Sequence, residues 1–270
     1  MKKKLLIFSL FFISLTLFAC SKSETETPTS TEKGDIRIMQ YNIRYGVGMD
    51  GVFDIDRLVN VLKDAKADVI ILNEVDKNYS SRSNNMFMAE YIAEKLGMNF
   101  VFEPSIVIKN PPNPNREVGN AILTKQKLKH IETLFFSEGD QWPRVISKCL
   151  INFDDERKLY VAVSHYGLTE SGRIKQAQET LEFLSDVDND PVIFSGDLNA
   201  YPDSEPIQII SAKYHDAFRT RNDFYTFPAN NPDRRIDYIF GNGKVTFRNN
   251  ARVILTQASD HLPTMVDITF

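Results

Sequence analysis

One short stretch of the sequence constrains the fold most, because an apolar run is followed at once by two polar side chains. The run covers residues 192–194 between Pro191 and Gly196, and its length and composition predict a buried strand. Asp197 and Asn199 come next. Residues two apart on extended backbone point to the same side, so the carboxylate and the carboxamide should project together from the strand end. A catalytic site uses such a pair, and a packed core does not.

Other predicted strands also end at polar side chains. Strands are predicted over residues 35–43, 68–72, 119–123, 128–136, 145–153, 158–163, 235–240 and 265–270. The polar residues at or beside their ends are Asn42, Glu74, His165, Asp237, Asp260 and His261. Taken singly, a glutamate at a strand end is usually solvated and a lone histidine usually makes a structural hydrogen bond. If the strands converge on one rim, however, these groups gather in a single cleft.

Helical spacing of apolar residues predicts helices over residues 54–66, 87–96 and 170–186. Asp203 is a candidate cap for a short helix that runs through Ile210. Arg173 lies in the first turn of the helix at 170–186, where it could face the same site as His165.

The collected polar groups favour one kind of chemistry. Carboxylates and carboxamides with few sulfur atoms suit a hard, oxygen-preferring cation such as Mg²⁺, Mn²⁺ or Ca²⁺, and not zinc. Two histidines beside a metal and several carboxylates suit hydrolysis of a phosphate ester, because the metal and a charged histidine neutralise developing negative charge while a carboxylate orients water.

The order of the motifs resembles that of a known superfamily. The motifs are Y-N-I-R (41–44), L-N-E-V-D (72–76), G-N-A-I-L (119–123), S-H-Y (164–166), G-D-L-N-A-Y-P (196–202), R-I-D-Y-I (235–239) and S-D-H-L-P (259–263). Together they resemble the endonuclease/exonuclease/phosphatase superfamily, which has the DNase I-like fold of metal-dependent phosphoesterases. The resemblance implies an α/β (α+β) fold, in which a two-sheet β-sandwich flanked by helices makes four layers and carries the active site at one end.

The resemblance also implies a metal site. Glu74 resembles the principal metal-binding glutamate of the family, with Asn42 beside it, and Asp260 contributes to the same site. Asn73 stands before Glu74 where glutamine is commoner, and the S-H-Y motif stands where Thr-His-Leu is usual. Both departures are conservative and leave the catalytic groups intact.

The catalytic roles follow from the same resemblance. Asp197 resembles the aspartate that orients or deprotonates the attacking water, and Asn199 the neighbour that helps hold the phosphate. His261 resembles the histidine that supports the transition state, with Asp237 as the partner that fixes its tautomer. His165 resembles the second phosphate-binding histidine.

Two further residues are expected to bind substrate. Asn120, in the G-N-A segment, is expected to contact the phosphate by the same resemblance. Arg173 is a candidate from its position in the chain, and with Arg82, Arg116 and Arg144 it could form a clamp for a small phosphate, although each of these arginines taken alone is an ordinary surface residue.

The N-terminus resembles a bacterial lipoprotein signal. Lys2, Lys3 and Lys4 precede an apolar segment at 5–18 that is too short for a comfortable membrane span. Cys20 follows at once and would be lipidated; an ordinary signal peptide or an uncleaved anchor are the alternatives. We therefore expect a signal peptide at 1–19, a lipidated Cys20 with a flexible tether at 20–33, and a catalytic domain at 34–270. The enzyme would be anchored to a bacterial membrane and face the periplasm or the exterior, and we expect a monomer.

The net charge of the chain narrows the class of substrate that we expect. Removal of the three signal lysines takes the net charge from −4 to −7, and an acidic chain lacks the basic stripe with which a nuclease usually holds the duplex. We therefore expect a small or headgroup-like phosphodiester or phosphomonoester as substrate. An extracytoplasmic endonuclease is the alternative, because local potential can differ from net charge. A binding lipoprotein that keeps the fold without turnover is a third hypothesis. Cys149 is expected to be a small buried residue.

Overall fold

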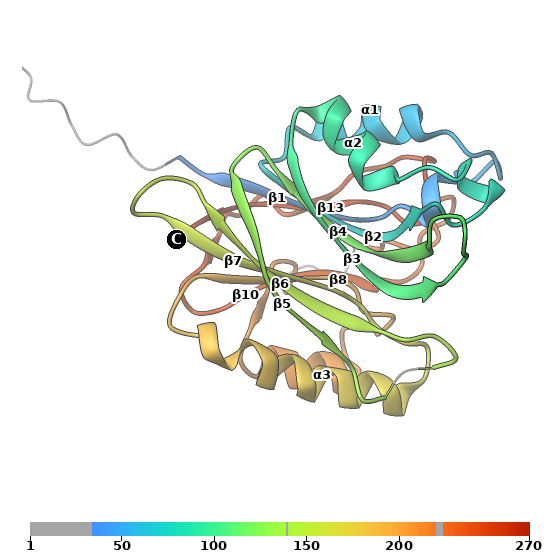
Figure 1. Ribbon diagram of the computed structural model, residues 1–270. Helices are drawn as coiled ribbons and strands as arrows, with labels where there is room; N and C mark the ends of the chain where they lie inside the picture. Colours follow the sequence, from blue (N-terminus) through green and yellow to red (C-terminus); the bar gives the residue numbers. More distant parts are fainter. Residues whose placement is uncertain (1–33, 139, 220–223) are drawn as a thin grey trace, which may run out of the picture. The chain divides into compact units, whose positions relative to one another are not determined.

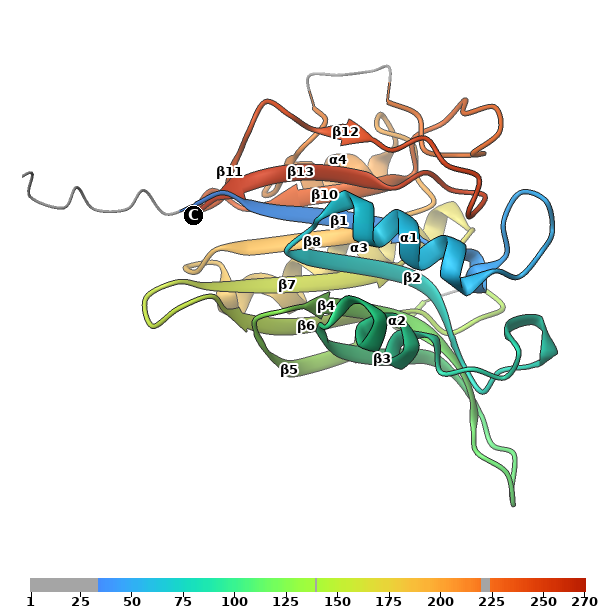
Figure 2. The ribbon, with the colours of Figure 1, turned by 90° about the horizontal axis from the view of Figure 1, so that it is seen from above.

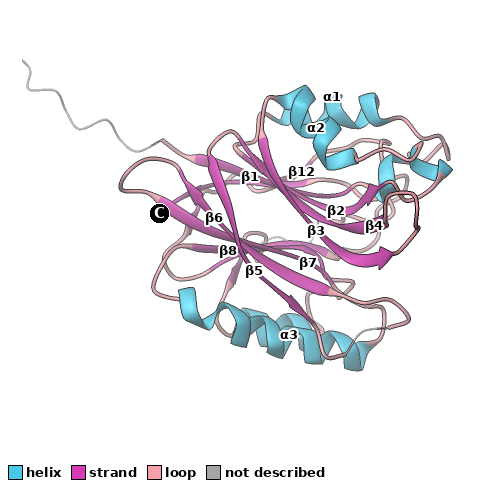
Figure 3. Ribbon diagram, in the orientation of Figure 1, coloured by secondary structure: helices cyan, strands magenta, loops and turns pink. Residues whose placement is uncertain are grey.

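Two β-sheets pack face to face in this protein, and helices cover their outer faces (Figures 1 and 3). The computed structural model describes residues 34–138, 140–219 and 224–270, so the predicted signal peptide and tether lie outside the described residues. The predicted two-sheet sandwich flanked by helices is confirmed. Among the described residues, no helix has the length and apolar character needed to cross a membrane.

The first sheet is seven-stranded in the described residues and has the order β11-β13-β1-β2-β4-β3, with β12 paired to β13. Its strands are β1 (Ile36–Asn42), β2 (Val69–Lys77), β3 (Asn99–Ile108), β4 (Arg116–Thr124), β11 (Thr246–Phe247), β12 (Arg252–Val253) and β13 (Thr264–Thr269). β1 and β2 run parallel. Their carboxyl ends therefore meet at the same edge of the sheet, with Asn42 opposite Asn73.

The second sheet has the order β5-β6-β7-β8-β10-β9. Its strands are β5 (Lys127–Phe135), β6 (Val145–Asn152), β7 (Lys158–His165), β8 (Val192–Asp197), β9 (His215–Asp216) and β10 (Asp237–Gly241). β7 and β8 run parallel, whereas β10 is antiparallel to β8. The ends of β7 and β8 therefore lie beside the beginning of β10.

Helices α1 (Ile55–Ala65) and α2 (Met88–Leu96) cover the first sheet, and α3 (Glu170–Leu184) and α4 (Glu205–Ser211) cover the second, as Figure 2 also shows from above. Short 3₁₀ turns occur at Arg44–Gly46, Ser81–Ser83 and Ser185–Val187. The Asp54 side chain caps α1 by accepting from the Arg57 amide. The predicted cap at Asp203 is wrong: α4 begins one residue later, after Ser204, and Pro206 in its first turn fixes the start.

Three apolar layers hold the sheets and helices together. One lies between α1, α2 and the first sheet, one between the two sheets, and one between the second sheet and its helices. Strand β1 is therefore buried on both faces: Met39 and Tyr41 pack toward the helices, while Ile36 and Ile38 pack toward the second sheet. Gln40 is fully buried as well, and its side chain points to the site described below.

Cys149 on β6 is fully buried in the middle layer, as predicted. Burial, with a smaller effect of Glu103, raises the pKa of its thiol to about 12. In a protein that begins at Ser21, where it is the only cysteine, we expect no reaction with a thiol reagent in the native state, because the thiolate is the reactive form. Absorbance during labelling measures this, with urea-unfolded protein as the reactive control. Rapid labelling of the native protein would contradict this packing.

Candidate active site

The polar residues predicted from separate strand ends meet at one end of the sandwich. The first sheet contributes Asn42 and Glu74, and the second contributes His165, Asp197 and Asp237. Asn199, Asp260 and His261 come from the loops beside them. In the second sheet, β-pairing places Asp197 directly between His165 on one side and Asp237 on the other. The strand register therefore assembles three of the groups in one row.

Asp197 is the centre of the site. One oxygen, Oδ2, lies 3.5 Å from His165 Nε2 and 3.6 Å from His261 Nε2, and accepts a 3.0 Å hydrogen bond from Asn42 Nδ2. The other, Oδ1, accepts from the Asn199 amide at 3.0 Å. The residue is only 2% exposed. A water on its open side would thus meet a carboxylate whose orientation four neighbours fix.

His261 is oriented and charged by Asp237. Its Nδ1 lies 2.8 Å from Asp237 Oδ2, and Gln40 Nε2 donates to Asp237 Oδ1 at 2.8 Å. This bond places a proton on Nδ1 and turns Nε2 toward Asp197. Burial alone would lower the pKa of His261, but Asp237 and Asp197 outweigh burial and raise it to about 10. The imidazole is therefore a cation at neutral pH.

The His165 ring is neutral, in contrast to the charged ring of His261. Burial lowers its pKa to about 4, against the pull of Asp197. Asn199 Nδ2 donates to its Nε2 at 3.1 Å and to the Tyr166 carbonyl at 3.0 Å, so Nε2 is an acceptor and the ring is neutral. Asp197 thus lies between one charged and one neutral histidine.

Asn199 reaches the site by a different route from the predicted one. Strand β8 continues through Asp197, and Asn199 has a left-handed φ of 49°, so the two residues do not share one extended strand. A turn, and not strand alternation, brings the carboxamide to His165. Gly196 is required here, because a Cβ at this position would lie 1.8 Å from the Ser164 carbonyl oxygen.

Two positioning residues, Gln40 and Asn73, are absent from the sequence prediction. Asn73 Oδ1 accepts from Gln40 Nε2 at 3.2 Å and from the Asp197 amide at 2.9 Å. Its Nδ2 donates to Asn120 Oδ1 at 2.8 Å and to the Ser164 carbonyl at 3.0 Å. Gln40 and Asn73 therefore join the two sheets directly beneath the site. A polar residue inside an apolar strand was the signal that could have identified Gln40.

Glu74 leaves the strand ladder to enter the site. The pairing of β2 with β4 shifts between Leu72 and Val75, and Glu74 has a φ of 57° at this bulge. Asn42 Nδ2 donates to its Oε1 at 3.0 Å. Burial, with Asp260 and Asp197 nearby, raises its pKa.

Comparison with known proteins agrees with this geometry. The model of the Endonuclease/Exonuclease/phosphatase family matches residues 39–261. The chain belongs to this family.

Solved structures share its fold. The endonuclease/exonuclease/phosphatase from Beutenbergia cavernae is 21% identical with a TM-score of 0.67, and the match covers 87% of this chain and 72% of that one. The protein from Bacteroides vulgatus is 18% identical with a TM-score of 0.69, covering 88% and 100%. The Bacteroides thetaiotaomicron mannosyl-6-phosphatase is 17% identical with a TM-score of 0.64, covering 87% and 100%. No curated protein matches the chain.

As a member of the endonuclease/exonuclease/phosphatase family, the chain is a metal-dependent phosphoesterase. The donor set fits a divalent cation, because Glu74 and Asp260 add oxygen ligands and burial disfavours the negative charge of Glu74 until a cation is present. Asp197, Asp237 and His261 also have ligand atoms within 4.8 Å of one another. Both ring nitrogens of His261 already face carboxylates, since Nδ1 lies 2.8 Å from Asp237 Oδ2 and Nε2 lies 3.6 Å from Asp197 Oδ2. Glu74, Asp260 and the neighbouring Asn42 are therefore the better match.

The two predicted substrate-binding residues lie in different places. Asn120 is 3% exposed and lines a pocket of about 240 Å³ that opens beside Glu74 and His165. Arg173 is not among the described residues that line it; its Nη1 donates to the carbonyls of Gly167 at 3.5 Å and Leu168 at 2.6 Å.

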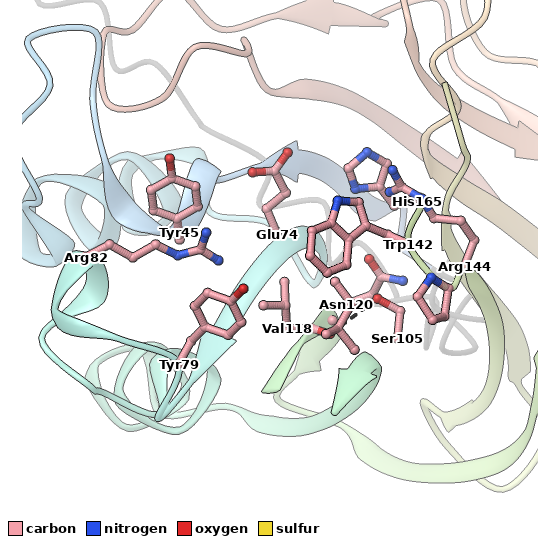
Figure 4. A pocket seen from close by; sticks show the side chains of 13 residues that line it. Tyr45, Glu74, Tyr79, Arg82, Ser105, Val118, Asn120, Trp142, Arg144 and His165 are labelled. Carbon is pink, nitrogen blue, oxygen red and sulfur yellow. Dashed lines mark hydrogen bonds between the residues drawn. The ribbon is translucent and has the colours of Figure 1, made fainter. Parts of the chain in front are cut away.

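Arginines that the sequence marked only as surface candidates line this pocket, together with aromatic residues that the sequence analysis did not single out (Figure 4). They are Arg82 and Arg144, together with Tyr45, Tyr79 and Trp142. The pocket adjoins the catalytic centre, because Glu74 and His165 belong to both.

The two histidines should titrate separately in metal-free protein. We expect the His261 ring to stay charged until about pH 10 and the His165 ring to stay neutral above about pH 4. A pH series of imidazole NMR shifts measures this, with each signal assigned by its loss in the His261→Ala or His165→Ala protein. In urea both rings should titrate near pH ~6.5. A folded protein in which both also titrate there would contradict the described environments.

Proposed function

We propose that this enzyme hydrolyses a small or headgroup-like phosphate ester, a phosphodiester or phosphomonoester, by direct attack of water. One observation carries the proposal: the buried Asp197 carboxylate lies 3.6 Å from a charged histidine and 3.5 Å from a neutral one, beside a carboxylate site for a cation. Asp197 orients the water and accepts its proton as the water oxygen bonds to phosphorus. The P–O bond to the alcohol breaks in the same reaction, and the alcohol leaves with a proton taken from solvent. His261, held by Asp237, stabilises the negative charge that develops on the phosphate oxygens.

The remaining groups hold the substrate and the cation. We assign phosphate binding to Asn199, His165 and Asn120, and binding of the divalent ion to Glu74, Asp260 and Asn42. When bound, that ion supplies a positive charge that polarises a phosphoryl oxygen. Mg²⁺ suits this oxygen-rich donor set, as Mn²⁺ or Ca²⁺ also would.

The pocket supports a small substrate. Arg82 is already paired with Asp76 through contacts of 2.7 and 2.8 Å, and Arg144 lies 3.2 Å from Asp140. These arginines therefore have little spare charge for a nucleic-acid backbone, which agrees with the net charge of −4 for the chain. One solved structure with a related fold is named a mannosyl-6-phosphatase, and this supports a small phosphate ester as the class of substrate. An endonuclease would use the same catalytic groups. The comparison of small esters with supercoiled DNA, described below, distinguishes the two functions.

We also propose that the enzyme acts as a monomer outside the cytoplasm, attached to a bacterial membrane through a lipidated Cys20. The apolar segment at 5–18 after three lysines supports this location.

Substitution of the central groups should abolish hydrolysis without unfolding the protein. We expect Asp197→Ala and His261→Ala each to lower kcat/KM by at least about 10²–10⁴-fold, because each removes a group that acts on the reacting atoms. Asp64→Ala on α1 and His215→Ala on β9 are matched controls, since both residues are exposed and line pockets other than the one beside the site. Circular dichroism checks the fold. Full activity in both site variants would refute the site assignment.

Substrate choice is tested with purified residues 21–270 in Mg²⁺, Mn²⁺ or EDTA. We expect cleavage of bis-p-nitrophenyl phosphate, p-nitrophenyl phosphate or sphingomyelin with supercoiled DNA left intact, and we expect EDTA to remove the activity and Mg²⁺ to restore it. Product release is followed by absorbance or phosphate assay. Nicking of DNA at low enzyme concentration would instead establish the nuclease alternative.

A further inference from the structure

The pocket beside the catalytic groups has two aromatic walls that the hydrolytic step does not use. In Figure 4, Trp142 and Arg144 lie on the His165 side of the pocket, whereas Tyr45, Arg82 and Tyr79 lie on the other side. Trp142 is 43% exposed even though it lines a pocket. A large aromatic surface left open next to a catalytic centre is a natural contact for a substrate.

Trp142 is held firmly in this position by a nearly buried carboxylate. Asp140 Oδ1 accepts from the Trp142 amide at 2.8 Å, and Oδ2 accepts from the Leu168 amide at 3.0 Å and from Arg144 Nη2 at 3.2 Å. The Asp140 side chain is only 8% exposed. It therefore ties the backbone at Trp142 to the segment that follows His165, so the indole is attached to backbone that is held before any ligand arrives.

The opposite wall is a stack of rings around a neutralised arginine. The Arg82 guanidinium lies 4.0 Å from the ring centre of Tyr45 and 4.0 Å from that of Tyr79. Asp76, which is fully buried, pairs with it through both carboxylate oxygens. The wall therefore presents two aromatic rings with hydroxyl groups around Arg82, whose own charge Asp76 balances.

We infer that this pocket binds the organic part of the ester, and that this part is a ring without charge of its own, as in a sugar or a nucleoside. Aromatic faces stack on such rings, and Ser105 and Asn120 add polar groups. The balanced charges of Arg82 and Arg144 disfavour a second phosphate. The pocket volume of about 240 Å³ is below the roughly 300–1,000 Å³ of pockets that hold drug-sized ligands, so a single small ring suits it. The inference rests on the proposed function, since it names the alcohol of the ester that the site cleaves.

The single tryptophan of the chain makes the pocket directly observable. We would titrate the full chain, in detergent with EDTA, with glucose 6-phosphate, adenosine 5′-monophosphate and glycerol 3-phosphate, and follow tryptophan fluorescence. The first two carry rings and the third does not. We expect a saturable change with at least one ring-bearing ester, at an affinity about tenfold higher than that of glycerol 3-phosphate.

Calorimetry on variants then tests the role of the indole. Trp142→Ala should remove the preference for the ring-bearing ester, and Trp142→Phe should retain most of it, because a ring is kept. Tyr225→Ala is the matched control: Tyr225 is an aromatic residue with the same 43% exposure and lines a different pocket. It should keep the full preference.

The outcomes separate this inference from the proposed function. Preference for the sugar ester or for the nucleotide would each support the inference and identify the ring. Equal affinity for all three esters, no fluorescence change, or an unchanged preference in Trp142→Ala would overturn it. These measurements use metal-free protein and no turnover, so a failure to hydrolyse any ester would refute the proposed function without affecting them.

Discussion

The ion pair between Asp237 and His261 is the interaction on which the rest of the site depends. Asp237 begins β10 in the second sheet, and Gln40 from β1 in the first sheet donates to its other oxygen. The imidazole is thus fixed by both sheets at once. Because Asp237 keeps His261 charged, the Asp197 carboxylate can remain buried 3.6 Å away. Breaking the pair would leave two carboxylates close together without a balancing cation.

Several residues at the catalytic end of the sandwich have a strained backbone. Arg44, Tyr45, Glu74 and Asn199 all have left-handed φ values between 42° and 57°. Such conformations cost on the order of 1–3 kcal/mol each for non-glycine residues and persist only when their surroundings enforce them. Three apolar layers and the ladders of two sheets provide that enforcement. The strain turns Glu74 and Asn199 toward the site and Tyr45 onto Arg82.

The catalytic centre and the adjoining pocket differ in their electrostatics. Excess negative charge remains around Glu74, Asp197 and Asp260, which is the condition for binding a cation. In the pocket, by contrast, Arg82 and Arg144 each have an acidic partner. The first region is therefore suited to a metal and a phosphate, and the second to an uncharged organic group. Asp140 joins the two regions, since it binds both the Trp142 loop and the segment after His165.

The sequence by itself determined most of the strands and helices and the chemical types at the site, because apolar runs next to Asp197, His165 or Glu74 are visible locally. The two-sheet fold followed from the resemblance of the motif order to a known superfamily, and β3, which has no fully buried residue, was not predicted. Tertiary structure decided how those groups face one another. Asn199 and Glu74 enter through left-handed turns that strand alternation does not predict. Gln40 and Asn73 act across the interface between sheets, and Arg82 and Trp142 acquire a role only from their neighbours. The charge states of the histidines and the stacking of Arg82 depend on contacts between residues distant in sequence. The local sequence pattern therefore could not predict them.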